Sequence, residues 1–190
     1  MPSNSPQTPL KAKAHLSQLV IVDVQTKLAA VMVPEAMQSL IKNSMILVAA
    51  ANLLDVPVLL TEQYAKGLGH SAPELLAALP NIKVIDKLNF SCMGEPKFSR
   101  QLTRDRSQML LLGMEAHICI LQTALDMLAM GKQVFVVEDA IISRSPEHKA
   151  NAIARMRDAG CIISNTESIV FEWLGRAEGE NFKVISQLIR

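Results

Sequence analysis

Short apolar runs of strand length alternate along this chain with longer segments whose apolar residues recur at helical spacing. The apolar runs cover residues 19–22, 56–60, 108–112, 133–137 and 161–163, and a further strand is expected over residues 83–86. Helical segments are expected over residues 33–54, 73–79, 96–103, 118–131, 146–159, 168–174 and 182–189. Continuous apolar runs suit strands buried on both faces, and strands that alternate with helices build parallel sheets. The pattern predicts an α/β fold in which helices cover both faces of a parallel sheet.

The composition is that of an ordinary globular chain. Its 190 residues are 49% apolar and 19% charged, and the formal net charge is +1. Such a charge gives no electrostatic attraction to nucleic acid or to an anionic membrane, and seven aromatic residues (five Phe, one Tyr, one Trp) offer little surface for base stacking. No apolar run approaches the ~20 residues of a membrane-spanning helix. We therefore expect no nucleic-acid partner and no membrane partner.

Residues 1–17 are polar and lack acidic side chains, so we expect a flexible tail before a single domain over residues 18–190. The tail has no apolar segment of the kind that a secretory signal needs, and it lacks the arginines of a mitochondrial leader. The three cysteines, Cys92, Cys119 and Cys161, are odd in number and form no CxxC pattern. This usage favours a reducing compartment over a disulfide framework or a zinc site. The expected location is the cytoplasm.

Three polar side chains stand where expected strands end. Asp23 follows the first strand, Lys87 follows the third, and Cys119 lies just across the turn after the fourth. In open parallel sheets, ligands bind beyond the carboxyl ends of the strands, where the strand order reverses. If these three strands are neighbours at that point, the acid, the lysine and the cysteine open onto one crevice.

Together these residue types have a direct chemical rationale. Cys119 is expected in the first turn of a helix, where free N–H groups and the helix dipole lower the pKa of a thiol. Asp23 could take up the thiol proton and return it to a leaving amine, while Lys87 keeps Asp23 ionised. Cys119 could then attack a carbonyl carbon and form a thioester, with backbone N–H groups receiving the oxyanion.

Each residue also has a simpler interpretation when it is taken alone. Cys119 could be a small buried hydrophobic residue, the commonest role of a lone cysteine. Asp23 could cap the helix that follows it, and Lys87 could be a solvated residue at a strand end. The sequence spacing alone leaves both interpretations open.

Three motifs, in this order, resemble the isochorismatase-like hydrolase superfamily. They are an apolar run followed by Asp23-Val24-Gln25, then Lys87-Leu88-Asn89-Phe90-Ser91, and then Gly113-Met114-Glu115-Ala116-His117-Ile118-Cys119-Ile120. Two further stretches are similar to the isochorismatase-domain-containing subgroup: Glu62 to Gly69 and Ser143-Arg144-Ser145. The resemblance extends from about Leu19 to the C-terminal helix.

The resemblance implies a three-layer α/β/α sandwich around a six-stranded parallel sheet, without a cofactor and with several copies of the chain in a homo-oligomer. It makes Asp23 the base, Lys87 its electrostatic partner and Cys119 the nucleophile. It also implies a cis peptide bond between Met114 and Glu115. That bond would direct the backbone N–H of Glu115, with that of Cys119, toward the oxyanion.

Departures from related patterns narrow the expected chemistry. Isochorismatases proper cleave a vinyl ether and lack the cysteine, so Cys119 indicates hydrolysis of an amide-type C–N bond. Nicotinamidases carry an Asp-x-His metal cluster after the second strand, where this chain has Glu62-Gln63-Tyr64. Neither a metal nor nicotinamide is therefore expected. After Gln25 the family frequently has an acidic or aromatic pair, whereas this chain has Thr26-Lys27-Leu28. This difference leaves the substrate specificity of the pocket open.

Position also suggests walls for a substrate pocket. The candidates are Gln25, Gln63, Tyr64, Phe90, His117 and Ile118. His117 lies two residues before Cys119, and residues at i and i+2 point to different faces of a helix, so it is expected at the pocket rim or at a subunit contact. We expect His70 to be a solvated loop residue, Cys92 to be structural and Cys161 to lie in the core.

The leading hypothesis is a cysteine hydrolase of a small carboxamide or a related C–N bond. The alternative is a binding or scaffold protein that keeps the fold without meaningful catalysis. A nucleotide-binding domain is disfavoured, because no Gly-x-Gly-x-x-Gly follows the first strand and no P-loop motif occurs.

Overall fold

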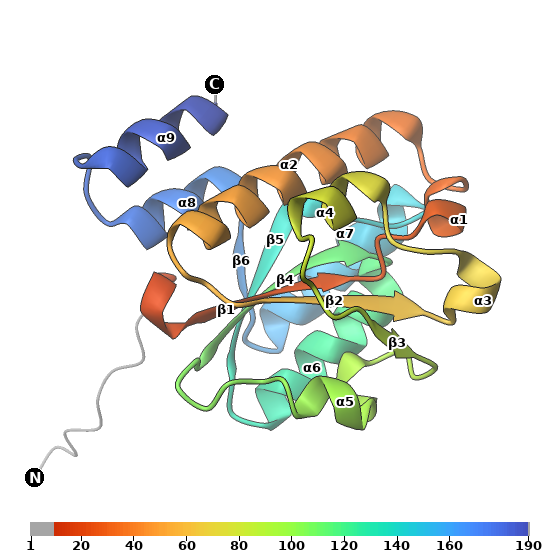
Figure 1. The fold of residues 1–190 in the computed structure, drawn as a ribbon. Helices are drawn as coiled ribbons and strands as arrows, with labels where there is room; N and C mark the ends of the chain where they lie inside the picture. The colour runs from red at the N-terminus through yellow and green to blue at the C-terminus, as the bar shows by residue number, and fades with distance from the viewer. Residues whose placement is uncertain (1–9, 190) are drawn as a thin grey trace, which may run out of the picture.

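The computed structural model describes residues 10–189, which form one six-stranded sheet with helices on both faces (Figure 1). All neighbouring strands are parallel, in the order β3-β2-β1-β4-β5-β6. The strands are β1 (Ser17–Val22), β2 (Val58–Gln63), β3 (Ile85–Lys87), β4 (Gln108–Met114), β5 (Gln133–Ile142) and β6 (Ile162–Ser164). The predicted three-layer α/β/α fold with six parallel strands is confirmed.

The helices occupy the segments between the strands. They are α1 (Thr26–Ala29), α2 (Pro34–Leu53), α3 (Ala65–Leu68), α4 (Pro73–Ala78), α5 (Pro96–Ser99), α6 (Leu121–Ala129), α7 (Pro146–Asp158), α8 (Thr166–Leu174) and α9 (Glu180–Leu188). Single helical turns add η1 (Ala14–Leu16), η2 (Cys92–Gly94) and η3 (Ala116–Ile120). Proline at the first helical position begins four of these helices, α2, α4, α5 and α7, because its missing N–H has no partner there in any helix.

Several element boundaries differ from the sequence prediction. Strand β5 continues to Ile142 although Glu138 and Asp139 interrupt its apolar run, because its last residues pair with the end of β4 after a shift in register. Strand β2 likewise continues to Gln63, three residues beyond the apolar run of residues 56–60. Helix α5 ends at Ser99, four residues before the expected end. The short helices α1 and α3 were not predicted, because four residues are too few to show a helical period.

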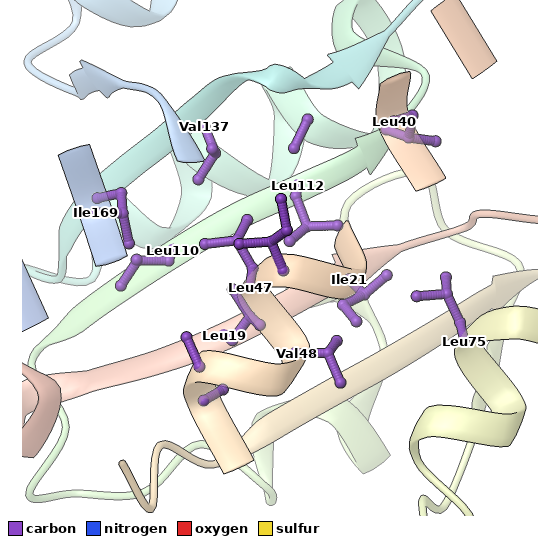
Figure 2. Close-up of a cluster of buried hydrophobic side chains, with 14 of the residues drawn as sticks. Leu19, Ile21, Leu40, Leu47, Val48, Leu75, Leu110, Leu112, Val137 and Ile169 are labelled. Carbon is purple, nitrogen blue, oxygen red and sulfur yellow. The ribbon is translucent and has the colours of Figure 1, made fainter. Parts of the chain in front are cut away.

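Two apolar cores lie on the two faces of the sheet. The side chains of β1 alternate between them: Leu19 and Ile21 face α2, α4, α8 and α9, whereas Val20 and Val22 face α5, α6 and α7. Figure 2 shows the first core, in which Leu47 and Val48 of α2 pack over the strands. Strand β1 is buried along its whole length, as expected for a central strand with both faces covered.

The expected flexible tail covered residues 1–17. Residues 1–9 lie outside the described residues, whereas the stretch from Ala12 onward is part of the folded unit. Ala12 is fully buried, and the backbone N–H of Lys13 donates to the side chain of Gln108 at 2.7 Å. The tail was therefore predicted too long, because side chains distant in the sequence hold this polar stretch.

Within residues 10–189, none of the helices has the length and the apolar character needed to cross a membrane.

Candidate active site

The carboxyl ends of the central strands bring Asp23 and Lys87 into direct contact. Lys87 Nζ lies 2.7 Å from Asp23 Oδ2, and both side chains are completely buried. Asp23 leaves β1 with a φ of 52°, a left-handed conformation that aspartate tolerates better than most residues do. Strand β2 separates β1 from β3, so these strands are not neighbours as we had supposed. The length of the lysine side chain bridges the intervening strand.

Residues of the intervening strand complete this arrangement. Thr61 Oγ1 donates to the other carboxylate oxygen of Asp23 at 2.7 Å, and Gln63 Oε1 accepts from Lys87 Nζ at 2.7 Å. Sequence reasoning missed Thr61, although it stands on β2 level with Val22, the residue before Asp23. The available signal was its position: Thr61 directly follows the apolar run of residues 56–60, as Asp23 follows the run of residues 19–22.

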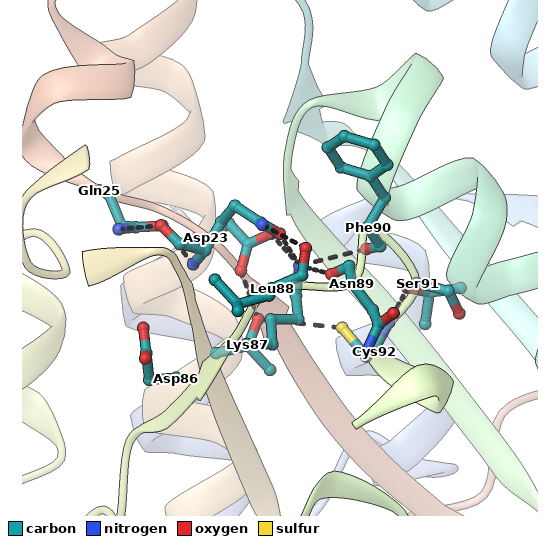
Figure 3. Close-up of polar contacts among 12 residues, drawn as sticks. Asp23, Gln25, Asp86, Lys87, Leu88, Asn89, Phe90, Ser91 and Cys92 are labelled. Carbon is teal, nitrogen blue, oxygen red and sulfur yellow. Dashed lines mark hydrogen bonds and ion pairs between the residues drawn. The ribbon is translucent and has the colours of Figure 1, made fainter. Parts of the chain in front are cut away.

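The ammonium group of Lys87 is held by four acceptors. Besides Asp23 and Gln63, it donates to the backbone carbonyls of Asn89 at 3.2 Å and Phe90 at 3.1 Å (Figure 3). Burial by itself lowers the pKa of Lys87. The charge and the hydrogen bond of Asp23, together with the thiolates that Cys92 and Cys119 form at high pH, outweigh this effect, so the pKa of Lys87 lies above its usual value. Lys87 is therefore a fixed positive charge beneath the site.

Cys119 reaches the same place from β4. It lies in η3, two residues before α6 begins, and its thiol is close enough to Asp23 for the carboxylate to raise the pKa of the thiol. The peptide bond between Met114 and Glu115, just before this turn, is cis. Gly113 has a φ of +122° and faces Val22 of β1; a Cβ there would lie 2.0 Å from the Val22 carbonyl oxygen. Only glycine fits where β4 passes β1 on its way to the cysteine turn.

The thiol of Cys119 does not have the lowered pKa that its place near a helix start suggests. Burial raises the pKa well above the ordinary value, and the adjacent negative charge of Asp23 raises it further, while Lys87 opposes these effects only in part. The expectation of a lowered pKa was wrong, because desolvation and the charge of Asp23 outweigh the effect of the first helical turn on the thiol. In the resting site Cys119 is a neutral thiol next to a carboxylate that can accept its proton.

A small cavity of about 90 Å³ opens beside Cys119. Its lining comprises Leu28, Gln63, Leu68, Phe90, Glu115, Ile118 and Cys119. A larger hollow of about 710 Å³ lies between α1, α2 and α4, but no residue of the Asp23-Lys87-Cys119 group lines it. The small cavity is therefore the one placed for chemistry at the thiol.

The structure brings Gln63, Phe90 and Ile118 to this cavity, but not the other three expected wall residues. Gln25 is buried, and its amide group donates to the carbonyls of Gln63 and Gly69 at 3.1 and 2.6 Å, so it ties two loops together. Tyr64 and His117 also lie outside the lining. Tyr64 is 51% exposed, in a left-handed conformation at the end of β2.

Glu115 forms a charged wall of the cavity. Its carboxylate is nearly buried and pairs with the guanidinium of Arg144, whose Nε lies 3.0 Å from Oε1. His117 Nδ1 lies 3.0 Å from the hydroxyl oxygen of Ser143, and its ring stacks against that of His148. Burial, together with His148 and Arg144, lowers the pKa of His117 despite the opposing effect of Glu115. The Ser143-Arg144 stretch thus braces the turn that precedes Cys119.

The remaining candidates lie as follows. The backbone N–H of Cys92 donates to Thr123, and its sulfur lies 3.9 Å from Thr61 Oγ1; burial raises the pKa of its thiol to about 11. Cys161 is buried in the second core, and His70 is largely exposed, with Nδ1 3.1 Å from Glu62. Across residues 10–189, no group of three or more His, Cys, Asp or Glu side chains is arranged to hold a metal ion.

Comparisons with known proteins agree with this geometry. The model of the isochorismatase domain family matches residues 17–168. The chain is 38% identical to the secreted isochorismatase effector Isc1 of Phytophthora sojae, over 93% of this chain and 85% of that one. It is 36% identical to isochorismatase domain-containing protein 2 of Danio rerio, over 91% and 86% of the two chains. The solved structure of the MAR1 ribonuclease from Caenorhabditis elegans superposes with a TM-score of 0.88 at 36% identity, covering 94% and 92% of the chains. On these matches, the chain belongs to the isochorismatase family.

Proposed function

We propose that this protein is a cysteine-dependent hydrolase that cleaves the C–N bond of a small carboxamide through a thioester intermediate. The observation that carries the proposal is the buried pair of Asp23 and Lys87 at 2.7 Å, close enough to Cys119 for both charges to act on its thiol, with the cavity opening beside that thiol. A nucleophile, a base and a group that orients the base are the three parts that such chemistry requires. The family membership supports a hydrolase in general.

In the first half of the reaction, Asp23 takes the proton of Cys119 as the sulfur attacks the carbonyl carbon of the amide. The negative charge that develops on the carbonyl oxygen is received by the backbone N–H groups of Glu115 and Cys119. Asp23 then gives its proton to the amide nitrogen, the C–N bond breaks, and the amine leaves. The acyl group remains on sulfur as a thioester.

In the second half, a water molecule attacks the thioester carbonyl while Asp23 takes a proton from that water. The C–S bond breaks, the carboxylic acid leaves, and the proton returns to the sulfur of Cys119. Lys87 keeps Asp23 an acceptor before each attack, because a fixed positive charge favours the ionised carboxylate. This cycle requires no cofactor.

The name of the nematode relative makes RNA cleavage a second candidate. Two observations favour the amide. A nucleotide does not fit a cavity of about 90 Å³, and the net charge of +1 gives no attraction for a phosphate backbone. The alternative from a different class is a binding or scaffold protein without meaningful catalysis. This alternative predicts no turnover of either an amide or RNA.

Ammonia release from a panel of carboxamides tests the proposal directly, with RNA cleavage assayed in parallel. Cys119→Ala and Cys119→Ser should each lower amide turnover by about 10³-fold or more. Cys161→Ala is the matched control, because it removes another buried thiol that lies away from the cavity. Unchanged turnover in the Cys119 variants would refute the cysteine mechanism.

Self-association is part of the proposal, as the family resemblance implies. Sedimentation equilibrium on the full chain measures it, and a single species at 20.8 kDa would contradict it.

A further inference from the structure

We propose that the substrate is a small, uncharged, aliphatic carboxamide, and that Leu28, Leu68 and Phe90 set the length of its acyl chain. This inference rests on the proposed amide hydrolysis at Cys119. It follows from the size, the lining and the charge balance of the cavity at that thiol.

The volume limits the size of the acyl group. Pockets for drug-sized ligands measure about 300–1,000 Å³. The cavity at Cys119 measures about 90 Å³. Because one water molecule takes up about 30 Å³ in the liquid, the cavity holds roughly three to five non-hydrogen atoms. An acyl chain of a few carbons fits this space, whereas an aromatic ring with its carboxamide does not.

The lining selects for an apolar acyl group. Leu28, Leu68, Phe90 and Ile118 present hydrocarbon to the cavity, and they come from four separate segments of the chain. The polar side chains Gln63 and Glu115 of the lining are already engaged. Gln63 Nε2 donates to the Leu88 carbonyl at 2.9 Å and its Oε1 accepts from Lys87, while the Glu115 carboxylate is paired with Arg144. A hydroxyl or carboxylate on the acyl chain would lose its water without gaining a partner in this lining.

The charges at the site are balanced without a substrate. Asp23 is paired with Lys87 at 2.7 Å, and Glu115 is paired with Arg144 at 3.0 Å. Each of these two carboxylates therefore has its own cation, and among the described residues that line the cavity no charged side chain is left to compensate an ionic group on the substrate. A charged substrate would be desolvated here without a counter-ion, which costs several kcal/mol. The balance favours a neutral amide.

Two short helices close the wall that limits the chain length. Leu28 belongs to α1 and Leu68 to α3, and these helices contact each other. Lys27 Nζ donates to the carbonyl of Gly67 at 3.0 Å, which links the two helices directly. Phe90 stands at the opening, 54% exposed while still lining the cavity. Truncating any of these side chains lengthens the space without touching the reacting groups.

The test compares kcat/KM for acetamide, propionamide, butyramide, hexanamide, benzamide and succinamate. The wild-type protein should prefer the short neutral amides over hexanamide, benzamide and succinamate. Leu68→Ala and Leu28→Ala should each raise the ratio of hexanamide to acetamide by about tenfold, because each methylene that becomes buried adds to binding. Leu88→Ala is the matched control: it removes an equal side chain that is 73% exposed and absent from the lining.

The possible outcomes distinguish a failure of this inference from a failure of the proposed amide hydrolysis on which it rests. Turnover that depends on Cys119 but prefers benzamide or succinamate would overturn the inference and leave the hydrolase standing. The same holds if turnover depends on Cys119 and the chain-length ratio is equal in Leu68→Ala, Phe90→Ala and Leu88→Ala. Turnover that survives in Cys119→Ala would overturn the function itself. If Leu28→Ala does not fold, the Leu68 and Phe90 variants carry the test alone.

Discussion

The ammonium group of Lys87 and the carboxylate of Asp23 meet at 2.7 Å, although a third strand separates the two that carry them. Both side chains are fully buried, so neither charge has water to stabilise it. Each is tolerated because the other is present and because further hydrogen bonds satisfy both groups: Thr61 donates to Asp23, and Gln63 and two backbone carbonyls accept from Lys87. The position of the catalytic pair therefore depends on the folded structure, and the stability of the fold depends on both members of the pair being present.

Lys87→Met should destabilise the protein as well as inactivate it, because it leaves a buried carboxylate without a cation. The expected loss in the free energy of unfolding is about 3–5 kcal/mol, measured by urea denaturation. Lys97→Met, the same change at an exposed position, should lower stability by less than about 0.5 kcal/mol. Equal losses in the two variants would show that the buried pair contributes nothing specific.

Asp23→Asn should have opposite effects on the acidity of Cys119 and on catalysis. Removing the negative charge that helps to raise the pKa of the Cys119 thiol should shift the pH midpoint of its alkylation downward, by about one unit or more. Amide hydrolysis should meanwhile fall by about 10²–10⁴-fold, because the proton acceptor is gone. The rates of iodoacetamide labelling between pH 6 and 11, located by peptide mass spectrometry, follow the rising flank of this titration and report the shift of its midpoint.

Cys161 serves as the internal reference in that experiment, since its pKa is raised by burial alone. Its midpoint should be the same in both proteins. A Cys119 midpoint that stays fixed in Asp23→Asn, or moves upward, would contradict the electrostatic coupling between the two residues.

Gly113→Ala should be among the most damaging single-methyl additions in the chain. The added Cβ would lie 2.0 Å from the Val22 carbonyl oxygen, at a φ of +122°. We expect a loss of about 4 kcal/mol or more, seen as a lower melting temperature or as insoluble protein. Gly131→Ala separates steric overlap from backbone strain, because Gly131 has a φ of +77° and no atom within 4 Å of its Cβ position. Its cost should be about 1–2 kcal/mol; equal damage at both sites would exclude the close approach of β4 to β1 as the cause.

Stability should fall in alkali partly through Cys161. Burial raises the pKa of this thiol from 9.0 to about 11, so the unfolded chain loses the proton first. The stabilisation is present below pH 9 and is lost as the pH rises toward 11. Two pKa units correspond to about 2–3 kcal/mol. Urea denaturation of Cys161→Ala at pH 8.5 and 10.5 should show a correspondingly smaller decline than wild type, since all other groups titrate equally in both. Parallel declines would contradict this assignment.

Strand and helix order could be derived from local patterns because each apolar run carries its own signal. The run from Leu19 to Val22 became the central strand, and Asp23 stood at its end as expected. The pattern failed where pairing between distant segments overrides local composition. Strand β5 continues past Glu138 and Asp139 because its last residues, Ile141 and Ile142, pair with the end of β4. Helices α1 and α3 are too short to leave any periodic trace.

The sequence by itself determined that a parallel sheet would form and that an acid, a lysine and a cysteine would follow three of its strands. Spatial order was decided only in the tertiary structure, which inserted β2 between Asp23 and Lys87 and recruited Thr61 to the carboxylate. The protonation of Cys119 was decided there too, because desolvation depends on which segments cover a thiol and not on its neighbours along the chain. The tertiary structure also decided the size of the cavity, because Leu28 and Leu68 line it from two short helices that the sequence pattern did not predict. Periodicity is local information, whereas burial and proximity depend on the packing of the whole chain.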